Sequence, residues 1–337
     1  MYPLARKLLF KLEPERAHAL TLQLLRLAAL VPGIRAVLRA WYQPPALPVK
    51  AFGLAFINPV GLAAGYDKDG LAWRGLALLG FGHIEIGTVT PHPQPGNPPP
   101  RVFRLVQDQA LINRMGFPSR GAAFVASRVR HRAHDIVIGV NLGKNRDTPL
   151  IKAGADYVSL LRTFAPLADY LVVNVSSPNT TGLRRLQARR ALEELLSLMV
   201  VERSKLQPGL GRAVPILVKL APDLDQADLD DALQAILQTG IEGIVATNTT
   251  LSRKGLRSSL AQASGGLSGA PLGPRSTEMI RQICQRTGGR LPVIGVGGIL
   301  SAAQAREKID AGACLVQVYT GLVFVGPGLV KSILQGL

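Results

Sequence analysis

Eight short apolar segments recur from residue 58 onward, and nearly every one is followed by a helical or loop stretch. Each segment is a continuous run of Val, Ile and Leu, which is typical of strands that are buried on both faces of a parallel sheet. The segments are 59–64, 83–87, 136–141, 170–175, 215–220, 243–248, 292–296 and 314–319. Intervening stretches such as 191–205 have helical spacing. This pattern predicts the α/β class and a (β/α)8 TIM barrel rather than an open sheet.

Composition excludes several classes of protein. Hydrophobic residues make up 47% of the 337 residues and charged residues 18%, so the chain has a large core and wholesale disorder is excluded. Cys284 and Cys314 cannot form a disulfide framework and lack zinc-site spacing. His131 and His134 stand among arginines, and we interpret them as part of a solvated helix face. We expect no metal site.

Residues 1–45 differ from the rest and form a predicted N-terminal two-helix extension to a barrel domain of residues 46–337. Leu4, Leu8 and Leu12 recur at helical spacing, and Pro14 opens a second leucine-rich helix. The first 50 residues hold eight basic and two acidic residues, a net charge of +6 within the chain's +17. Two interpretations remain: a monotopic contact with an anionic membrane, or a helical hairpin packed on its own domain. No apolar run is long enough to span a bilayer.

Polar or glycine residues stand at the end of every predicted strand. In this fold the carboxyl ends of the strands meet at one face, where active sites form. The residues at or just after these ends are Gly65, Lys68, Thr88, Asn141, Asn174, Lys219, Thr247, Asn248, Gly298, Tyr319 and Thr320. We expect them to share one site.

Glycine-rich turns after the seventh and eighth strands predict a phosphate site, because such turns expose backbone N–H groups. Leu300 stands where a dinucleotide fingerprint requires its last glycine, so a mononucleotide is favoured over NAD. Three interpretations of Lys219 stay open: a Schiff-base lysine, a cation held against an electron-rich cofactor ring, or a lysine at the edge of the core that reaches solvent. The side-chain amides of Asn113, Asn174, Asn179 and Asn248 suit a planar, pyrimidine-like substrate.

At these residues the chain resembles dihydroorotate dehydrogenase, and more closely its class 2, quinone-dependent, membrane-associated branch. The resemblance covers nearly the whole chain. The segments that carry it are AGYDKDG at 64–70, GTVTP at 87–91, NRMGF at 113–117, NVSSPNT at 174–180, GGLSG at 265–269 and GVGGI at 295–299. Serine at position 177, where class 1 enzymes have cysteine, and the N-terminal extension both favour class 2.

The resemblance implies oxidation of (S)-dihydroorotate to orotate in pyrimidine biosynthesis, with FMN as hydride acceptor and a membrane quinone as final acceptor. FMN would contact Ala64, Gly65, Thr88, Asn141, Asn174, Lys219, Thr247, Gly269, Gly298, Tyr319 and Thr320. Dihydroorotate would contact Lys68, Asn113, Arg114, Met115, Gly116, Phe117, Asn174, Asn179, Asn248 and Thr249. The catalytic set would be Ser177, Thr180, Phe117 and Lys219, with Ser177 as the general base and a proton relay through Thr180 and water.

The resemblance also gives the extension a role as an apolar entrance for quinone, with His18, Arg104 and Tyr319 at the quinone end. We expect a monomer that lies peripherally on the cytoplasmic face of a bacterial inner membrane. Tyr66, Thr181 and Thr320 depart from the residues common in the family. Thr181 replaces a usual proline, which affects closure of the 177–187 loop more than the chemistry.

Three alternatives stay open from the residues. A class 1 or related flavin enzyme would use fumarate or NAD. A lysine-dependent aldolase would form a Schiff base at Lys219 and carry no flavin. A nucleic-acid-binding protein is indicated by the charge alone, and the sequence has no aromatic platform or basic module for it, so we expect no nucleic-acid partner.

Overall fold

A closed barrel of parallel strands forms the centre of the computed structural model, which describes residues 2–130 and 136–337. His131 and His134 lie outside the described residues. Within these ranges the barrel has eight strands in the order β10-β12-β13-β3-β4-β7-β8-β9. They are β3 (Val60–Leu62), β4 (His83–Val89), β7 (Val137–Leu142), β8 (Tyr170–Asn174), β9 (Ile216–Leu220), β10 (Gly243–Ala246), β12 (Val293–Val296) and β13 (Ala313–Val318). Each predicted apolar segment supplies one strand, so the predicted barrel is confirmed.

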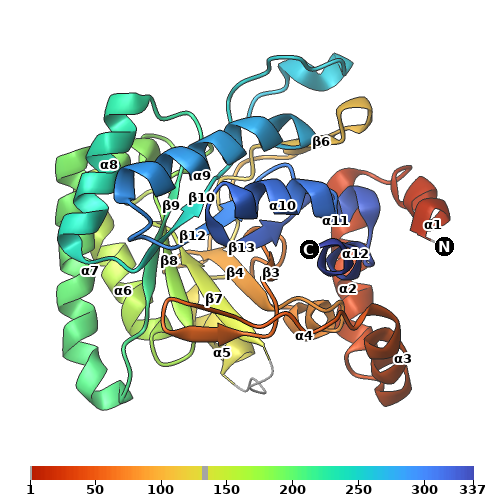
Figure 1. Ribbon diagram of the computed structural model, residues 1–337, viewed down its shortest axis with the longest axis horizontal. Helices are drawn as coiled ribbons and strands as arrows, with labels where there is room; N and C mark the ends of the chain where they lie inside the picture. The colour runs from red at the N-terminus through yellow and green to blue at the C-terminus, as the bar shows by residue number, and fades with distance from the viewer. Residues whose placement is uncertain (1, 131–135) are drawn as a thin grey trace.

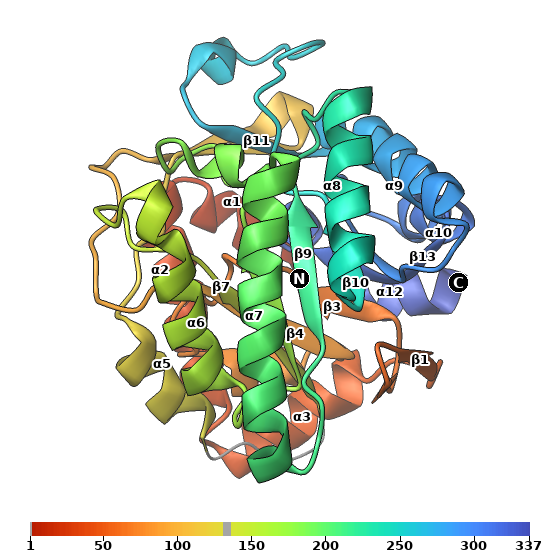
Figure 2. The same ribbon diagram turned by 90° about the vertical axis from the view of Figure 1, so that its left-hand side faces the viewer.

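Helices surround the barrel and cover the outer faces of its strands (Figure 1). They are α4 (Trp73–Ala77), α5 (Ala122–Val129), α6 (Ala153–Phe164), α7 (Arg189–Leu210), α8 (Gln226–Thr239), α9 (Gly273–Thr287), α10 (Ala302–Asp310), α11 (Thr320–Val325) and α12 (Leu329–Gly336). Figure 2 shows α6, α7 and α8 along one side of the barrel. Local signals set their ends: α8 begins where Asp225 accepts a hydrogen bond from the Asp228 N–H at 2.8 Å, and it stops at Gly240 in the left-handed region.

Short elements close the two ends of the barrel. The hairpin of β1 (Val49–Ala51) and β2 (Leu54–Phe56) precedes the first barrel strand. A three-stranded antiparallel sheet of β5 (Val102–Leu105), β6 (Ala110–Asn113) and β11 (Gly266–Gly269) lies at the end toward which β9 points (Figure 2). The 3-10 helices are η1 (Val106–Asp108), η2 (Leu150–Lys152), η3 (Leu183–Gln187), η4 (Ser259–Gln262) and η5 (Ala270–Leu272).

The predicted N-terminal helical extension is present, and residues 2–42 form three helices rather than two. They are α1 (Tyr2–Leu9), α2 (Pro14–Ala28) and α3 (Pro32–Tyr42). We did not predict α3, which begins because Pro32 at its first turn restarts the helix after the break at α2. Within the described parts of the chain, no helix alone is long and apolar enough to cross a bilayer; α2 and α3, bent by 110°, meet the length and composition criteria only as a pair.

The extension is attached to one side of the barrel, beside α11 and α12 (Figure 1). The Tyr2 hydroxyl donates to the carbonyl of Val323 at 2.6 Å, and Arg104 donates to the carbonyls of Phe10 and Leu12 at 2.9 and 2.7 Å. The backbone of α2 passes so close to α4 that a Cβ at Gly75 would lie 2.1 Å from the Leu25 carbonyl oxygen. Glycine at position 75 therefore permits this contact.

Candidate active site

A cavity opens at the carboxyl ends of the barrel strands, and its empty volume of about 1000 Å³ suits a small-molecule site. We call it the mouth cavity. The predicted residues that line it are Ala64, Gly65, Lys68, Thr88, Asn113, Met115, Gly116, Phe117, Asn174, Ser177, Asn179, Lys219, Thr247, Asn248, Thr249, Gly269, Gly298, Tyr319 and Thr320. Of the described residues predicted for the cofactor, substrate and catalytic sets, Asn141, Thr180 and Arg114 do not line it. The barrel thus brings together most of the set that the strand ends indicated.

A chain of buried hydrogen bonds forms the floor of the mouth cavity. The Asn174 amide donates to Thr88 Oγ1 and to Asn141 Oδ1, both at 2.9 Å. Asn141 in turn donates to Glu85 Oε1 at 2.7 Å, and Gln317 donates to the other oxygen of Glu85 at 2.8 Å. Asn141 therefore lies beneath Thr88 and Asn174 and holds both in place through hydrogen bonds.

Glu85 is a residue that our sequence analysis missed. It lies in the middle of β4 and is fully buried. A carboxylate inside an apolar strand is costly unless it is paired or hydrogen-bonded, so its presence between Ile84 and Ile86 was the available signal. Its negative charge acts on Lys219, where it favours the ammonium form.

Lys219 projects from β9 into the mouth cavity and is only 5% exposed. No described residue accepts a hydrogen bond from its ammonium group, although the cavity contains carbonyl and hydroxyl oxygens. Burial lowers the pKa of Lys219, and the charge of Glu85 opposes this shift. An unpartnered buried cation at the cavity surface fits a ligand that carries or gains negative charge.

Glycine backbones form a cradle in the mouth cavity, where β11 ends at Gly269 and where Gly298 follows β12. A Cβ at Gly298 would lie 2.3 Å from the Gly273 Cα, and one at Gly269 would lie 2.3 Å from the Gln109 carbonyl oxygen. Gly298 also has φ +72°, a conformation that favours glycine. The Thr320 and Ser268 hydroxyls are 2.8 Å apart beside this cradle. Exposed backbone N–H groups and hydroxyls of this kind suit a phosphate, so the residues present fit a phosphate-bearing cofactor.

The loop after β8 carries the predicted catalytic serine. The Asn179 N–H donates to Ser177 Oγ at 3.2 Å, and the Asn179 amide donates to Asn113 Oδ1 at 3.3 Å. Thr180 is 7% exposed, and its hydroxyl has no hydrogen-bond partner among the described residues. A buried hydroxyl without a protein partner is a position for an ordered water.

Further asparagine contacts join this loop to the loop after β10. Asn248 donates to Ser176 Oγ at 3.0 Å and to Asn174 Oδ1 at 3.3 Å.

Arg114 turns away from the cavity and donates to the Pro100 carbonyl at 2.9 Å and to Ser264 Oγ at 2.7 Å. Arg114 therefore joins the segments around Pro100 and Ser264, and it does not line the mouth cavity as we predicted for a substrate-binding residue.

A second cavity, which we call the helical cavity, lies between the N-terminal helices and the barrel, with an empty volume of about 1430 Å³. Its wall includes Leu9, Phe10, Leu22, Leu71 and Val323. Lys68, Met115 and Tyr319 line both cavities. The helical cavity is thus separated from the mouth cavity by a thin wall of shared side chains.

Hydrogen bonds to one carbonyl hold this shared wall. Lys68 Nζ donates to the Gly65 carbonyl at 2.6 Å, and the Tyr319 hydroxyl donates to the same oxygen at 3.3 Å. Burial, together with the nearby positive charge of Arg101, lowers the pKa of Lys68 to about 8. Lys68 is therefore a cation at neutral pH that sits close to its titration range.

His18, Arg104 and Tyr319, which we predicted as the quinone set, all line the helical cavity. His18 Nε2 is 2.8 Å from the Tyr66 carbonyl oxygen, which only accepts hydrogen bonds, so this nitrogen carries the proton. Burial lowers the pKa of His18 to about 4, and the ring is neutral at pH 7. Its ring stacks edge-on against Tyr66, which stacks in the same way against Tyr319.

Comparisons with known proteins agree with this geometry. The model of the protein family described as dihydroorotate dehydrogenase matches residues 46–337 of this chain. A protein named dihydroorotate dehydrogenase (quinone) from Roseiflexus sp. (strain RS-1) is 52% identical over 340 residues, which cover 100% of this chain and 93% of that protein. A protein of the same name from Escherichia coli (strain SMS-3-5 / SECEC) is 49% identical, covering 98% of each chain.

A solved structure is also similar. The crystal structure of DHODH from Eimeria tenella in complex with ferulenol has a TM-score of 0.87 and 38% sequence identity, and the match covers 96% of this chain and 90% of that one. The family model spans far more than half of the chain, and the relatives share about half of its residues over its full length. The chain therefore belongs to the dihydroorotate dehydrogenase family.

Proposed function

We propose that this protein oxidises (S)-dihydroorotate to orotate in pyrimidine biosynthesis and delivers the electrons to a membrane quinone. The observation that carries the proposal is the pair of cavities with a shared wall, one lined by amides and a cation and the other lined mostly by apolar side chains. The two substrates differ in the same way, since dihydroorotate is a small polar acid and a quinone is largely apolar. The names of the full-length relatives support the same activity.

FMN is the proposed cofactor, in the mouth cavity. The cradle at Gly269 and Gly298 suits its phosphate, and Thr88, Asn174 and Lys219 line the part of the cavity left for its ring. When bound, FMN supplies hydride acceptance from carbon 6 of the substrate and transfer of electrons to quinone. The unpartnered ammonium of Lys219 is suited to stabilise negative charge on a reduced ring.

The substrate contacts in this proposal are made by a lysine and four asparagines. The Lys68 ammonium binds the substrate carboxylate through a charge-assisted hydrogen bond. The amides of Asn113, Asn174, Asn179 and Asn248 bind the ring amides; all of them line the mouth cavity. Amide groups both donate and accept, so they match a pyrimidine edge without adding charge.

Ser177 is the proposed general base that removes the proton from carbon 5. A serine hydroxyl does this only if its own proton leaves at the same time. The buried Thr180 hydroxyl, which has no partner among the described residues, supports a relay through an ordered water. Phe117 lines the cavity at this point, and its ring keeps bulk solvent from the relay.

Residues 1–45 are the proposed membrane and quinone-access segment. Leu4, Leu8, Leu24, Leu27 and Leu30 are 51–70% exposed, and several exposed large apolar side chains in one segment indicate a contact with a membrane or a partner. Basic residues accompany them, and each contributes about 1 kcal/mol near an anionic membrane surface. We propose a monomer bound peripherally to the cytoplasmic face of a bacterial inner membrane, with His18, Arg104 and Tyr319 at the quinone end of the helical cavity.

The visible spectrum of the purified protein tests this function. We expect flavin absorbance that bleaches when dihydroorotate is added without air and returns when a ubiquinone analogue follows. Fumarate or NAD in place of the quinone leaves the flavin reduced. A colourless protein that borohydride traps at Lys219 would instead indicate the aldolase, and reoxidation by fumarate would indicate a class 1 enzyme.

A further inference from the structure

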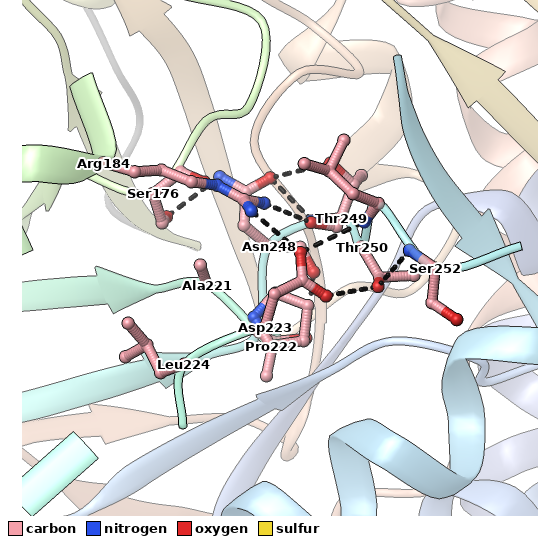
Figure 3. Close-up of polar contacts among 12 residues, drawn as sticks. Ser176, Arg184, Ala221, Pro222, Asp223, Leu224, Asn248, Thr249, Thr250 and Ser252 are labelled. Atoms are coloured by element: carbon pink, nitrogen blue, oxygen red, sulfur yellow. Dashed lines mark hydrogen bonds and ion pairs between the residues drawn. The ribbon is translucent and has the colours of Figure 1, made fainter. Parts of the chain in front are cut away.

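One guanidinium group joins three of the loops that form the mouth of the barrel (Figure 3). Arg184 lies in η3, shortly after the loop that carries Ser177. Its Nε donates to the carbonyl oxygen of Ser176 at 3.1 Å, and its Nη2 donates to that of Thr249 at 3.0 Å. Its Nη1 forms an ion pair with Asp223 at 2.8 Å. These partners belong to the loops that follow β8, β10 and β9.

Asp223 strengthens the same junction from the opposite side. Its carboxylate accepts hydrogen bonds from the Thr250 hydroxyl and, at 3.1 Å, from the Leu251 N–H. Arg184 and Asp223 are 23% and 27% exposed, so the pair is shielded from solvent over most of its surface. The loop after β10 is therefore bound to the guanidinium directly and again through Asp223.

The junction lies outside the mouth cavity but acts on residues that line it. Of the described residues, neither Arg184 nor Asp223 lines the cavity, whereas Ser177 and Thr249 do. The carbonyl that accepts from Nε is one peptide bond from Ser177, and the carbonyl that accepts from Nη2 belongs to Thr249 itself. Because the donors of a guanidinium have a fixed planar geometry, Arg184 sets the distance between these two backbone positions.

We propose that Arg184, oriented by Asp223, is a positioning residue that sets the separation between the base Ser177 and the substrate-binding residues Asn248 and Thr249. The inference rests on the proposed function, in which one loop removes the proton from a substrate that the other loop holds. In such a reaction an error of about 1 Å in position lowers the rate on the order of 100-fold. The role requires a group that binds both loops at once.

The test uses the flavin-loaded protein and separates its two half-reactions. In Arg184→Gln we expect the rate constant of flavin reduction by dihydroorotate to fall at least about ten-fold, and the Kd of orotate to rise. Asp223→Asn keeps the shape of the side chain and should show a smaller loss of the same kind. Flavin content and the rate of reoxidation by a ubiquinone analogue should stay within about two-fold of wild type in both.

Three further variants sharpen the result. Arg184→Lys should recover only part of the rate, because an ammonium group lacks the planar fork that reaches both carbonyls. The double variant of Arg184→Gln and Asp223→Asn should be no slower than Arg184→Gln alone, since both residues act through one junction. Arg190→Gln is the matched control: it removes an exposed ion pair with Glu194 on α7 and should change neither half-reaction.

Specific results would overturn the proposal. Wild-type reduction kinetics in Arg184→Gln would do so, as would equal losses in both half-reactions, which indicate a general effect on folding. If Arg184→Gln does not retain flavin, Asp223→Asn decides alone, and normal reduction in it counts against the proposal. If wild-type protein itself is not bleached by dihydroorotate, the proposed function fails and the positioning role fails with it; bleaching in wild type with unaffected variants overturns the positioning role only.

Discussion

The two cavities share a wall but are built by different means. In the mouth cavity, side chains from the strand ends hydrogen-bond to one another, as in the buried chain from Asn174 through Asn141 to Glu85. The helical cavity is closed by leucine-rich helices that a few polar contacts hold to the barrel, among them the ion pair of Arg101 and Glu15. The difference indicates that proton and hydride chemistry needs fixed donors, whereas an apolar ligand that enters and leaves needs mainly shape and apolar surface.

Replacing Ser177 should have the largest effect, and it should affect only the half-reaction that takes place in the mouth cavity. In Ser177→Ala we expect the rate constant of flavin reduction to fall on the order of 1000-fold, because the proposed base is lost, while reoxidation by quinone is unchanged. Anaerobic stopped-flow absorbance measures both. Ser159→Ala, which removes an exposed hydroxyl on α6 outside the mouth cavity, should leave reduction within about three-fold of wild type. Reduction at a normal rate in Ser177→Ala would remove Ser177 from the mechanism.

Filling the helical cavity should have the next largest effect, on the other half-reaction. Ala19 lies on α2, lines the helical cavity and is exposed, so a larger side chain there occupies the cavity without disturbing the core. In Ala19→Phe we expect the KM of a long-chain quinone to rise about ten-fold, with flavin reduction unchanged. Steady-state turnover against quinone concentration measures it. The matched control Ala36→Phe, on the exposed surface of α3, should leave this KM unchanged; an equal rise in both variants would contradict the assignment.

The pH dependence of ligand binding should identify Lys68 as a mouth-cavity residue. Its pKa of about 8 keeps the ammonium form below that pH and removes it above. The Kd of orotate should therefore be flat below pH 8 and rise about ten-fold per pH unit above it, measured from the flavin absorbance shift. Lys68→Met should bind orotate more weakly with no such rise, and Lys331→Met, on α12, should behave as wild type. A rise that persists in Lys68→Met would assign the titration to another group.

The smallest expected effect concerns attachment of the helices. The Arg101 and Glu15 side chains are 15% and 23% exposed and only 2.9 Å apart. Removing the charge in Glu15→Gln should weaken the attachment by about 1 kcal/mol, which makes proteolytic removal of the segment about five-fold faster. Flavin reduction should not change. Glu194→Gln, which breaks an exposed pair on α7, should leave the proteolysis rate at the wild-type value, and equal acceleration in both would show that the ion pair does not hold α2.

Much of the mouth cavity could be predicted because its residues follow apolar strands, and parallel strands end at one face. Thr88, Asn174 and Lys219 were found in this way. Arg184 and Asp223 were not, because they are 39 residues apart in the chain and neither follows a pattern that links it to Thr249. The third N-terminal helix was missed because a proline inside an apolar stretch signals both the end of one helix and the start of the next.

The sequence by itself determined the barrel, the face on which the site lies and the kinds of chemical group found there, because burial on both faces of a strand requires a continuous apolar run and strand ends converge in this topology. The tertiary structure alone decided which groups touch. It placed Asn141 under the site, turned Arg114 away from it, and brought Lys68 and Tyr319 into a wall between two cavities. These outcomes depend on packing between residues far apart in the chain, and such packing leaves no periodic signal in the sequence.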